Sequence, residues 1–582
     1  MSEHSYIKYP AIPVPYSIAQ GWESVLAEIS TTIASKRMKR FILAVECYQG
    51  VHHDELKKQF ALLPHELFVD TYALFKPENI VRELTYQDVT DDTVFGYMTR
   101  LTMTELMNQE QIHETEKIIG RTSGVIIVYG HGAALVTSEA DLLIYADMAR
   151  WEIQLRMRQH LVSNLVINNA NDSFSEQYKR GFFIDWRICD KLKKELHAKV
   201  DYWIDTNKKG EPKMISGDTF SMCMDAAASQ PFRVVPFFDP GPWGGQWMKE
   251  KFGLDDGPSN YAWCFDCVPE ENSLLFNFSD TIFEMPSINL VFFRSRDLLG
   301  EPVEARFGQE FPIRFDLLDT MQGGNLSLQV HPNTQYIRDH FGMNYTQDES
   351  YYILDAEKDA VVYLGLKKDI ERPAFIHDLE EAQCRKQPFD AGKFVNSFPA
   401  KKHDHFLIPG GTVHCSGKNS MVLEISATPY IFTFKLWDWS RLGLDGKPRP
   451  INIEHGKNVI DWKRDTDFVK QQLINRIVPI ASGEGWCEER TGLHENEFIE
   501  TRRHWFTVPV VHETGNGVNV LNLVEGDEVL VESPDNRFEP FAVHYAETFI
   551  VPASVGRYTI RPYGKSEGKK CAVIKAYIRF KS

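Results

Sequence analysis

The chain lacks any long uninterrupted apolar segment. None of its hydrophobic runs approaches the ~20 residues that a helix needs to cross a bilayer. Residues 1–19 also lack the basic start and apolar stretch of a secretory signal. We therefore expect a cytoplasmic protein that is not membrane-bound. At 582 residues the chain is too long for one hydrophobic core and should divide into three or four units.

Cysteines are few and show no framework spacing. There are nine of them, an odd number, which indicates a reducing compartment rather than a disulfide scaffold. The single C-x-x-C motif, Cys264 to Cys267, has no second pair at zinc-finger distance. We interpret it as two buried thiols in a strand.

Positive charge is in deficit. The chain has 81 acidic and 64 basic residues and a net charge of −17, which disfavours nucleic acid or an anionic membrane as a general partner. An anionic small molecule would therefore need a local basic cluster. Lys435, Arg441, Lys447 and Arg449 form such a cluster, although Lys447 and Arg449 fit a solvated charged face equally well.

A phosphate-binding P-loop is also missing. Apolar runs at residues 39–45, 125–130 and 141–146 alternate with helical stretches, including one through Trp151 and Arg158. This pattern predicts an α/β unit with a parallel sheet over residues 1–220, which resembles the nucleotide-kinase type. The segment after the first run reads ECYQGVHH (46–53), without the second glycine, the lysine or the hydroxyl of a P-loop. We expect no ATP hydrolysis and a decayed or regulatory domain.

Metal-binding side chains, by contrast, are present between residues 326 and 414. In LSLQVHP (326–332), Gln329 and His331 stand two residues apart, so on a strand they project from the same face. Glu349 begins the next strand-like segment. His414 ends IPGGTVH (408–414), whose turn directs it back toward the same point. These four side chains predict one site for a borderline ion such as Zn²⁺.

The same motifs resemble a known family. Cupin barrels carry H-x-H, a later glutamate and then P-x-G-x-x-H, and here Gln329 replaces the first histidine. That substitution within SLQVHP is similar to the class I mannose-6-phosphate isomerases, a family of zinc-dependent cupins. Other stretches resemble family motifs in the same order: WGG at 243–245, FPI at 311–313, VLEI at 422–425, LWDWSR at 436–441 and GKPR at 446–449. The resemblance covers residues 233–582.

The fold implied by this resemblance is a bicupin. We expect an α+β multidomain protein in which the N-terminal α/β unit precedes two β-barrels or jelly rolls. The first barrel, with inserted helical and loop segments, should span residues 233–455 and hold the metal. The second should span 456–582. Its stretch FIVPASVGR (549–557) echoes the P-x-G-x-x-H turn but ends in Arg557, so this barrel should be metal-free and structural.

The function implied is the interconversion of mannose 6-phosphate and fructose 6-phosphate through an enediol. This reaction needs a proton-transfer group and a means of stabilising negative charge on oxygen. Glu424 is the candidate carboxylate, either as the base or as a partner that orients His414. Arg441 matches the family's functional arginine, and its planar fork suits a phosphate or an oxyanion. Lys435, a candidate substrate-binding residue, stands where arginine is usual.

Departures from the family pattern keep other functions open. Gln347 and Asp316 stand where the family often has lysine. Fewer cations near a phosphate site suggest a different sugar or lost activity. A non-catalytic sugar-binding cupin that regulates carbohydrate metabolism is therefore an alternative. A bifunctional kinase-isomerase is disfavoured by the missing P-loop lysine. The sequence makes no prediction of oligomeric state.

A second pair of histidines, His403 and His405, also shares a strand face. Both lie close to Lys401 and Lys402. We therefore interpret them as part of a solvated loop rather than as metal ligands.

Overall fold

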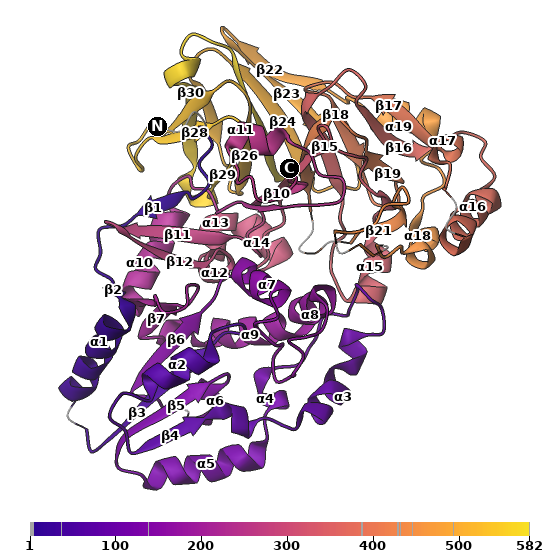
Figure 1. Ribbon diagram of the computed structural model, residues 1–582. Coiled ribbons are helices and arrows are strands. Elements are labelled where there is room, and N and C mark those ends of the chain that lie inside the picture. The colour runs from indigo at the N-terminus through magenta and orange to yellow at the C-terminus, as the bar shows by residue number, and fades with distance from the viewer. Residues whose placement is uncertain are drawn as a thin grey trace. The chain divides into compact units, whose positions relative to one another are not determined.

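The structure is a computed structural model that describes residues 5–36, 38–137, 139–385, 388–427, 430, 432–444, 446–447, 449–492 and 494–580 (Figure 1). Its described residues form two compact units. One contains residues Ala11–Ala227 and Glu270–Phe293. The other contains residues 5–10, Ala228–Pro269 and 294–580. None of the described helices is both long and apolar enough to cross a membrane.

The first unit is built on a mostly parallel sheet. Its strand order is β2-β8-β7-β6-β3-β5-β4, and the five strands from β7 to β4 run parallel. The bounds are β2 Ala19–Gln20, β3 Arg40–Cys47, β4 Leu67–Asp70, β5 Gly124–Gly130, β6 Leu142–Asp147, β7 Tyr202–Asp205 and β8 Lys213–Ser216. All six residues of β6 are buried, as expected for a parallel strand covered on both faces.

Helices alternate with these strands. They are α1 Gly21–Lys36, α2 His53–Phe60, α3 Glu78–Val89, α4 Met103–Leu106, α5 Gln109–Arg121, α6 Ala133–Val136, α7 Arg150–Arg158, α8 Phe174–Arg180, α9 Trp186–Leu196 and α10 Gly217–Ala228. Shorter turns are η1 Thr71–Leu74, the π-helical η2 Gly181–Asp185 and η3 His197–Lys199. A small sheet of β1 Ala11–Pro13, β11 Ser273–Phe278 and β12 Thr281–Pro286, with helix α12 Ile288–Phe293, completes this unit. The predicted parallel sheet is confirmed.

The second unit begins with a pair of antiparallel sheets. One has the order β18-β15-β20-β13-β10-β9 and the other β17-β16-β19-β14-β21. The strands are β9 Phe237–Asp239, β10 Trp263–Cys267, β13 Arg314–Asp319, β14 Leu328–Val330, β15 Glu349–Ala356, β16 Val361–Leu366, β17 Val395–Pro399, β18 His405–Ile408, β19 His414–Ser416, β20 Ser420–Ser426 and β21 Phe434–Trp437. The helices of this part of the chain are α11 Trp247–Phe252, α13 Ser295–Leu299, α14 Glu301–Phe307, α15 Thr334–Phe341, α16 Arg372–Arg385, α17 Ala391–Phe394, α18 Ile453–Val459 and α19 Thr466–Gln472.

A second pair of antiparallel sheets follows and repeats this order. One sheet reads β29-β26-β31-β24-β23-β22 and the other β28-β27-β30-β25. The strands are β22 Val478–Gly483, β23 Trp486–Gly492, β24 Ile499–Phe506, β25 Val510–Glu513, β26 Asn519–Glu525, β27 Glu528–Glu532, β28 Phe541–His544, β29 Thr548–Val551, β30 Arg557–Pro562 and β31 Cys571–Ile578, with turns η4 Ala553–Val555 and η5 Gly564–Ser566. Followed along the chain, the strands of the second pair occupy the same places in their two sheets as the strands of the first pair.

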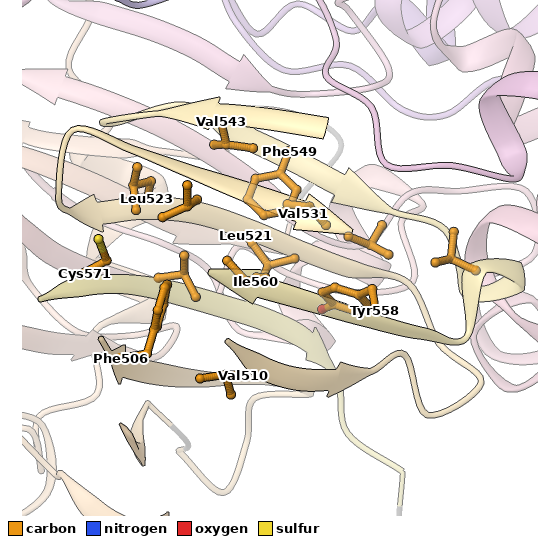
Figure 2. Packing of buried hydrophobic residues seen from close by; sticks show 14 residues of the cluster. Phe506, Val510, Leu521, Leu523, Val531, Val543, Phe549, Tyr558, Ile560 and Cys571 are labelled. Carbon is orange, nitrogen blue, oxygen red and sulfur yellow. The ribbon is translucent and has the colours of Figure 1, made fainter. Parts of the chain in front are cut away.

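The core of the second sheet pair lies between its two sheets. Side chains such as Phe506, Leu523, Val531, Phe549 and Ile560 point toward one another there and are fully buried (Figure 2). Burying apolar surface stabilises the fold by about 25 cal/mol per Å². Such a cluster is therefore the main source of stability for a sheet sandwich.

Two predictions about individual residues have opposite outcomes. Cys264 and Cys267 are buried free thiols in β10, as predicted. The interpretation of His405 as part of a solvated loop is wrong, because His405 is fully buried in β18. Its backbone pairs with Tyr352 of β15, and this pairing outweighs the local charge of Lys401 and Lys402. His403 is partly buried and contacts Glu525.

Candidate metal centre

Three predicted ligands meet between the sheets of the first pair. Nε2 of His331 lies 3.0 Å from Oε2 of Glu349, and Nε2 of His414 lies 2.8 Å from Oε1 of the same carboxylate. The three side chains have potential ligand atoms within 4.8 Å of one another, and all are buried. His331 directly follows β14 and His414 begins β19 of the same sheet, while Glu349 begins β15 in the other, so the cluster joins the two sheets.

Backbone carbonyls orient both imidazoles. Nδ1 of His331 lies 2.8 Å from the carbonyl oxygen of Phe432, and Nδ1 of His414 lies 2.8 Å from that of Thr412. If each Nδ1–H donates to its carbonyl, each Nε2 presents a lone pair to Glu349. When both imidazoles are neutral, these lone pairs face the carboxylate of Glu349, which is also a hydrogen-bond acceptor. Among the described residues, Nε2 of His331 and Oε1 of Glu349 accordingly have no hydrogen-bond partner.

A divalent cation fits this arrangement because it would bind imidazole and carboxylate lone pairs that otherwise face one another. Burial alone would raise the pKa of Glu349, but positive charge on the imidazoles of His331 and His414 would outweigh it and hold that pKa well below its usual range, so this carboxylate favours a cationic neighbour. Two imidazoles and one carboxylate are a donor set that zinc and related ions accept.

Gln329 is the fourth predicted ligand and stands beside the others. It is directly opposite His414 in the β14–β19 pairing, and its amide lies 3.3 Å from Nε2 of His414. Rotating the amide by half a turn would direct its oxygen to the same point. The structure therefore brings all four predicted ligands together.

Gln347, a departure from the family pattern, supports the centre. Its amide donates to Oε2 of Glu349 at 3.0 Å and accepts from the backbone N–H of Phe432 at 3.1 Å. The carbonyl of Phe432 in turn accepts from His331. One neutral side chain thus connects the supports of two ligands.

A row of charged groups extends from Glu349 across the sheet. Glu424 on β20 is directly opposite both Tyr351 of β15 and Asp316 of β13. Burial raises the pKa of Glu424 well above its ordinary value, and the nearby carboxylates of Glu349 and Asp316 add to the shift. Asp316 pairs with Arg314 at 2.8 Å. The predicted proton-transfer group therefore lies beside a metal ligand.

The predicted cations lie in or after β21, which pairs with β14 in the other sheet. Lys435 is directly opposite Gln329 in the β14–β21 pairing. Burial lowers its pKa to about 8, helped by the positive charge of Arg449. Nη2 of Arg441 donates to Asp438 at 2.7 Å, and Nη1 of Arg449 lies 3.1 Å from the same carboxylate. Asp438, which we did not single out in the sequence, thus holds both guanidinium groups together.

Arg441 is tied to the protein at all three of its guanidinium nitrogens, two of which donate to the backbone carbonyl and the carboxylate of Asp438. Besides Asp438, it donates from Nη1 to the carbonyl oxygen of Asn325 at 2.5 Å. Its side chain remains 18% exposed and Lys447 is exposed, so neither is sealed from a substrate. Pro448 of the GKPR stretch lies outside the described residues. A role of Arg441 in binding substrate remains a prediction.

The chain is similar to mannose-6-phosphate isomerases. ManA of Bacillus subtilis (strain 168) is 26% identical over 235 residues, which cover 40% of this chain and 69% of that protein. The enzyme of Streptococcus mutans is 25% identical over 223 residues, covering 38% of this chain and 64% of that protein. The match thus spans about two thirds of the length of these relatives.

The chain is also similar to a solved structure and to a family model. The crystal structure of the mannose 6-phosphate isomerase from Bacillus subtilis covers 60% of this chain and 100% of its own, with 18% identity and a TM-score of 0.48. Residues 21–229 match a family model described as a domain of unknown function, DUF8485. The N-terminal residues are thus similar to a family whose function is not described.

Proposed function

We propose that this chain is an aldose-ketose isomerase that interconverts mannose 6-phosphate and fructose 6-phosphate at the His331, Glu349 and His414 centre. The observation that carries the proposal is the convergence of these three buried side chains beside Gln329. The similarity to mannose-6-phosphate isomerases supports the choice of substrate.

One Zn²⁺ per chain is the proposed cofactor. Bound to Gln329, His331, Glu349 and His414, it would supply a Lewis acid that polarises the sugar oxygens. The protein fixes the ligand directions through the carbonyls of Phe432 and Thr412. Such partners of metal ligands contribute about 10–100-fold in metal affinity.

Glu424 is the proposed proton-transfer residue. In the reaction a proton leaves C2 of the open-chain aldose and a proton is added to C1, with an enediol between the two steps. Glu424 is a buried carboxyl that interacts with Glu349 and is not itself a proposed ligand. The carbonyl of Thr412 already orients His414, which supports proton transfer over an orienting role. A well-placed base contributes about 10²–10⁴-fold.

Lys435 and Arg441 are the proposed contacts to the anionic substrate. The backbone register places Lys435 next to Gln329, so an ammonium group lies at the edge of the centre. The guanidinium of Arg441 is held by Asp438 and Asn325, which reduces the entropy lost when it binds a phosphate or oxyanion.

The domain arrangement that accompanies this function is also a proposal. The repeated strand order of the two antiparallel sheet pairs supports two cupins in residues 233–455 and 456–582. The parallel order β4-β5-β3-β6-β7 supports a kinase-like unit in residues 1–220, without a P-loop lysine.

The test is a coupled assay of the purified chain on mannose 6-phosphate, with metal content measured on the same sample. We expect turnover that disappears after chelation and returns with Zn²⁺. Binding of the sugar phosphate without turnover would refute the isomerase and favour the non-catalytic regulator. Turnover of another aldose, but not of mannose 6-phosphate, would refute the substrate.

A further inference from the structure

The two antiparallel sheet pairs have corresponding positions in their strand pairings. In the first pair, Glu424 of β20 is opposite Asp316 of β13, and Glu349 of β15 is opposite Ser426 of β20. In the second pair, Lys575 of β31 is opposite Arg502 of β24, and Asn519 of β26 is opposite Tyr577 of β31. Because the strand orders match, Asn519 corresponds to Glu349, Lys575 to Glu424 and Arg502 to Asp316.

The other sheet extends this correspondence. His512 of β25 is opposite Tyr558 of β30, as Gln329 of β14 is opposite His414 of β19, so Tyr558 rather than the expected Arg557 takes the position of His414. The hydroxyl of Tyr558 donates to Oδ1 of Asn519 at 2.9 Å. This bond repeats, across the two sheets, the contact between His414 and Glu349.

The charge at these corresponding positions is inverted. The first pair has three carboxylates, Glu349, Glu424 and Asp316, where the second has a neutral amide, an ammonium group and a guanidinium group. A position that suits a cation in the first pair is therefore suited to an anion in the second.

Two buried histidines beside this position lack hydrogen-bond partners among the described residues, although Nε2 of His504 lies 3.4 Å from Oε1 of Glu488. His504 of β24 and His512 are 4% and 2% exposed, and none of their four ring nitrogens has a hydrogen-bond partner among the described residues. Their ring centroids lie 4.4 Å apart. Buried polar groups in native proteins are nearly always satisfied by protein, water or ligand. These rings therefore indicate a place for a polar occupant.

Lys575 is the available cation. It is 7% exposed, and its Nζ lies 5.7 Å from the centroid of the Tyr577 ring without a hydrogen bond among the described residues. The nearby carboxylates are already engaged, because Arg502 donates to Glu500 at 2.7 Å and to Glu488 at 2.8 Å. The Arg502 side chain is 27% exposed, so this end of the sheet pair reaches solvent. The apolar cluster fills the rest of the interior (Figure 2).

We propose that the second sheet pair binds an oxyanion of the phosphate class, free or as the phosphoryl group of a sugar phosphate, between Lys575, His504 and His512. Each neutral imidazole donates one N–H and the ammonium group supplies the charge. Neither the isomerase proposal nor the first centre is needed for this site. It differs from the metal-free, purely structural role that the sequence suggested for this segment.

A metal ion is the competing occupant of two close histidines. The electrostatics oppose it, because Lys575 and Arg502 are both cationic and the glutamates near them are paired with Arg502. In addition, the position of the ligand carboxylate is held by Asn519, which is neutral. The charged and titratable groups that face the proposed site from the surrounding strands are Glu488, Glu500, Arg502, His504, His512, Tyr558, Lys575 and Tyr577.

The test is calorimetric titration of the full, chelator-treated chain with sulfate, whose charge does not change near neutral pH. Wild type is compared with Lys575→Met and with the matched control Lys569→Met, an exposed lysine paired with Asp527. Anions bound elsewhere contribute equally to all three proteins. We expect one binding step to weaken at least tenfold in Lys575→Met and to be unchanged in Lys569→Met.

The pH dependence of sulfate binding tests whether the positive charge of Lys575 holds the anion. Burial lowers the pKa of Lys575 to about 8, so the Lys575-dependent step should weaken about tenfold between pH 7 and pH 9 as the ammonium loses its proton. Inorganic phosphate and glucose 6-phosphate are then titrated at pH 7. Tighter binding of glucose 6-phosphate identifies a phosphate ester as the occupant, and equal binding identifies the free anion.

Folding of the variants is checked by thermal melting. If Lys575→Met does not fold, His512→Phe provides the second test, since it keeps the ring but removes both nitrogens and should weaken the same step. Indistinguishable sulfate isotherms for wild type and the folded variant overturn the proposal. So does a second Co²⁺ ion per chain that His512→Ala removes and Lys575→Met retains, because that result identifies a metal site.

Discussion

Gln347 offers the sharpest test of how the centre is held together. Its amide donates to Glu349 at 3.0 Å and accepts from the Phe432 N–H at 3.1 Å, and the Phe432 carbonyl orients His331. Gln347→Ala removes both bonds and leaves one oxygen of Glu349 freer to turn away. Loss of such a partner typically weakens metal binding by about 10–100-fold, or about 1.4–2.7 kcal/mol.

The assay is competition for Zn²⁺ with a chromophoric chelator of known affinity, at fixed pH. The control is Gln335→Ala, because Gln335 lies on α15 of the same unit but bonds only to the exposed Asp339. We expect a weaker zinc affinity for Gln347→Ala and a wild-type value for the control. A zinc affinity for Gln347→Ala within twofold of wild type would refute the supporting role.

Three further predictions address the substrate cations, the N-terminal unit and pH. Arg441→Lys keeps the charge but loses the planar fork, so turnover should fall strongly at unchanged zinc content, whereas exposed Lys447→Ala should mainly raise KM, and more so at low salt. Lys193→Met leaves Asp147, its partner at 2.7 Å, buried without that cation and should lower the unfolding free energy by about 3–5 kcal/mol in denaturant titrations. Burial and Asp205 raise the pKa of Glu284 to about 7, so its cost to stability grows from the ordinary carboxyl pKa up to about pH 7 and is complete above it, and Glu284→Gln should raise Tm at pH 8 but not at pH 4.

Each of these predictions would be contradicted by one result. Wild-type turnover in Arg441→Lys would refute a specific role of the guanidinium group and leave only a diffuse basic patch. Lys193→Met should be compared with Lys117→Met, an exposed helix pair, and equal stability of the two excludes a buried ion-pair role. A Tm change in Glu284→Gln that is the same at both pH values would show that ionisation of Glu284 is not the cause.

The ligand set was predictable because each ligand sits in a short local motif. Gln329 and His331 share one strand face by period two, and the Pro-Gly-Gly turn fixes the direction of His414. The parallel sheet was equally visible, since buried strands such as β3 are continuous apolar runs.

Other features depend on contacts that are distant in sequence. The supports of the histidines are backbone carbonyls of Phe432 and Thr412, which carry no residue-type signal. His405 is buried by pairing with β15, although neighbouring lysines suggested solvent. Residues 270–293 pack with the N-terminal unit through contacts distant in sequence, such as the pairing of β11 with β1. The repeated register that aligns Lys575 with Glu424 likewise appears only when the strands are assembled.

The central claim is that His331, Glu349 and His414 together hold a metal ion on which isomerisation depends. The most direct measurement is the zinc content and mannose 6-phosphate turnover of His414→Ala, with His403→Ala as the control because His403 lies away from the centre and contacts Glu525. We predict that His414→Ala loses most of its zinc and its turnover, while His403→Ala keeps both. Full zinc occupancy in folded His414→Ala would contradict the account.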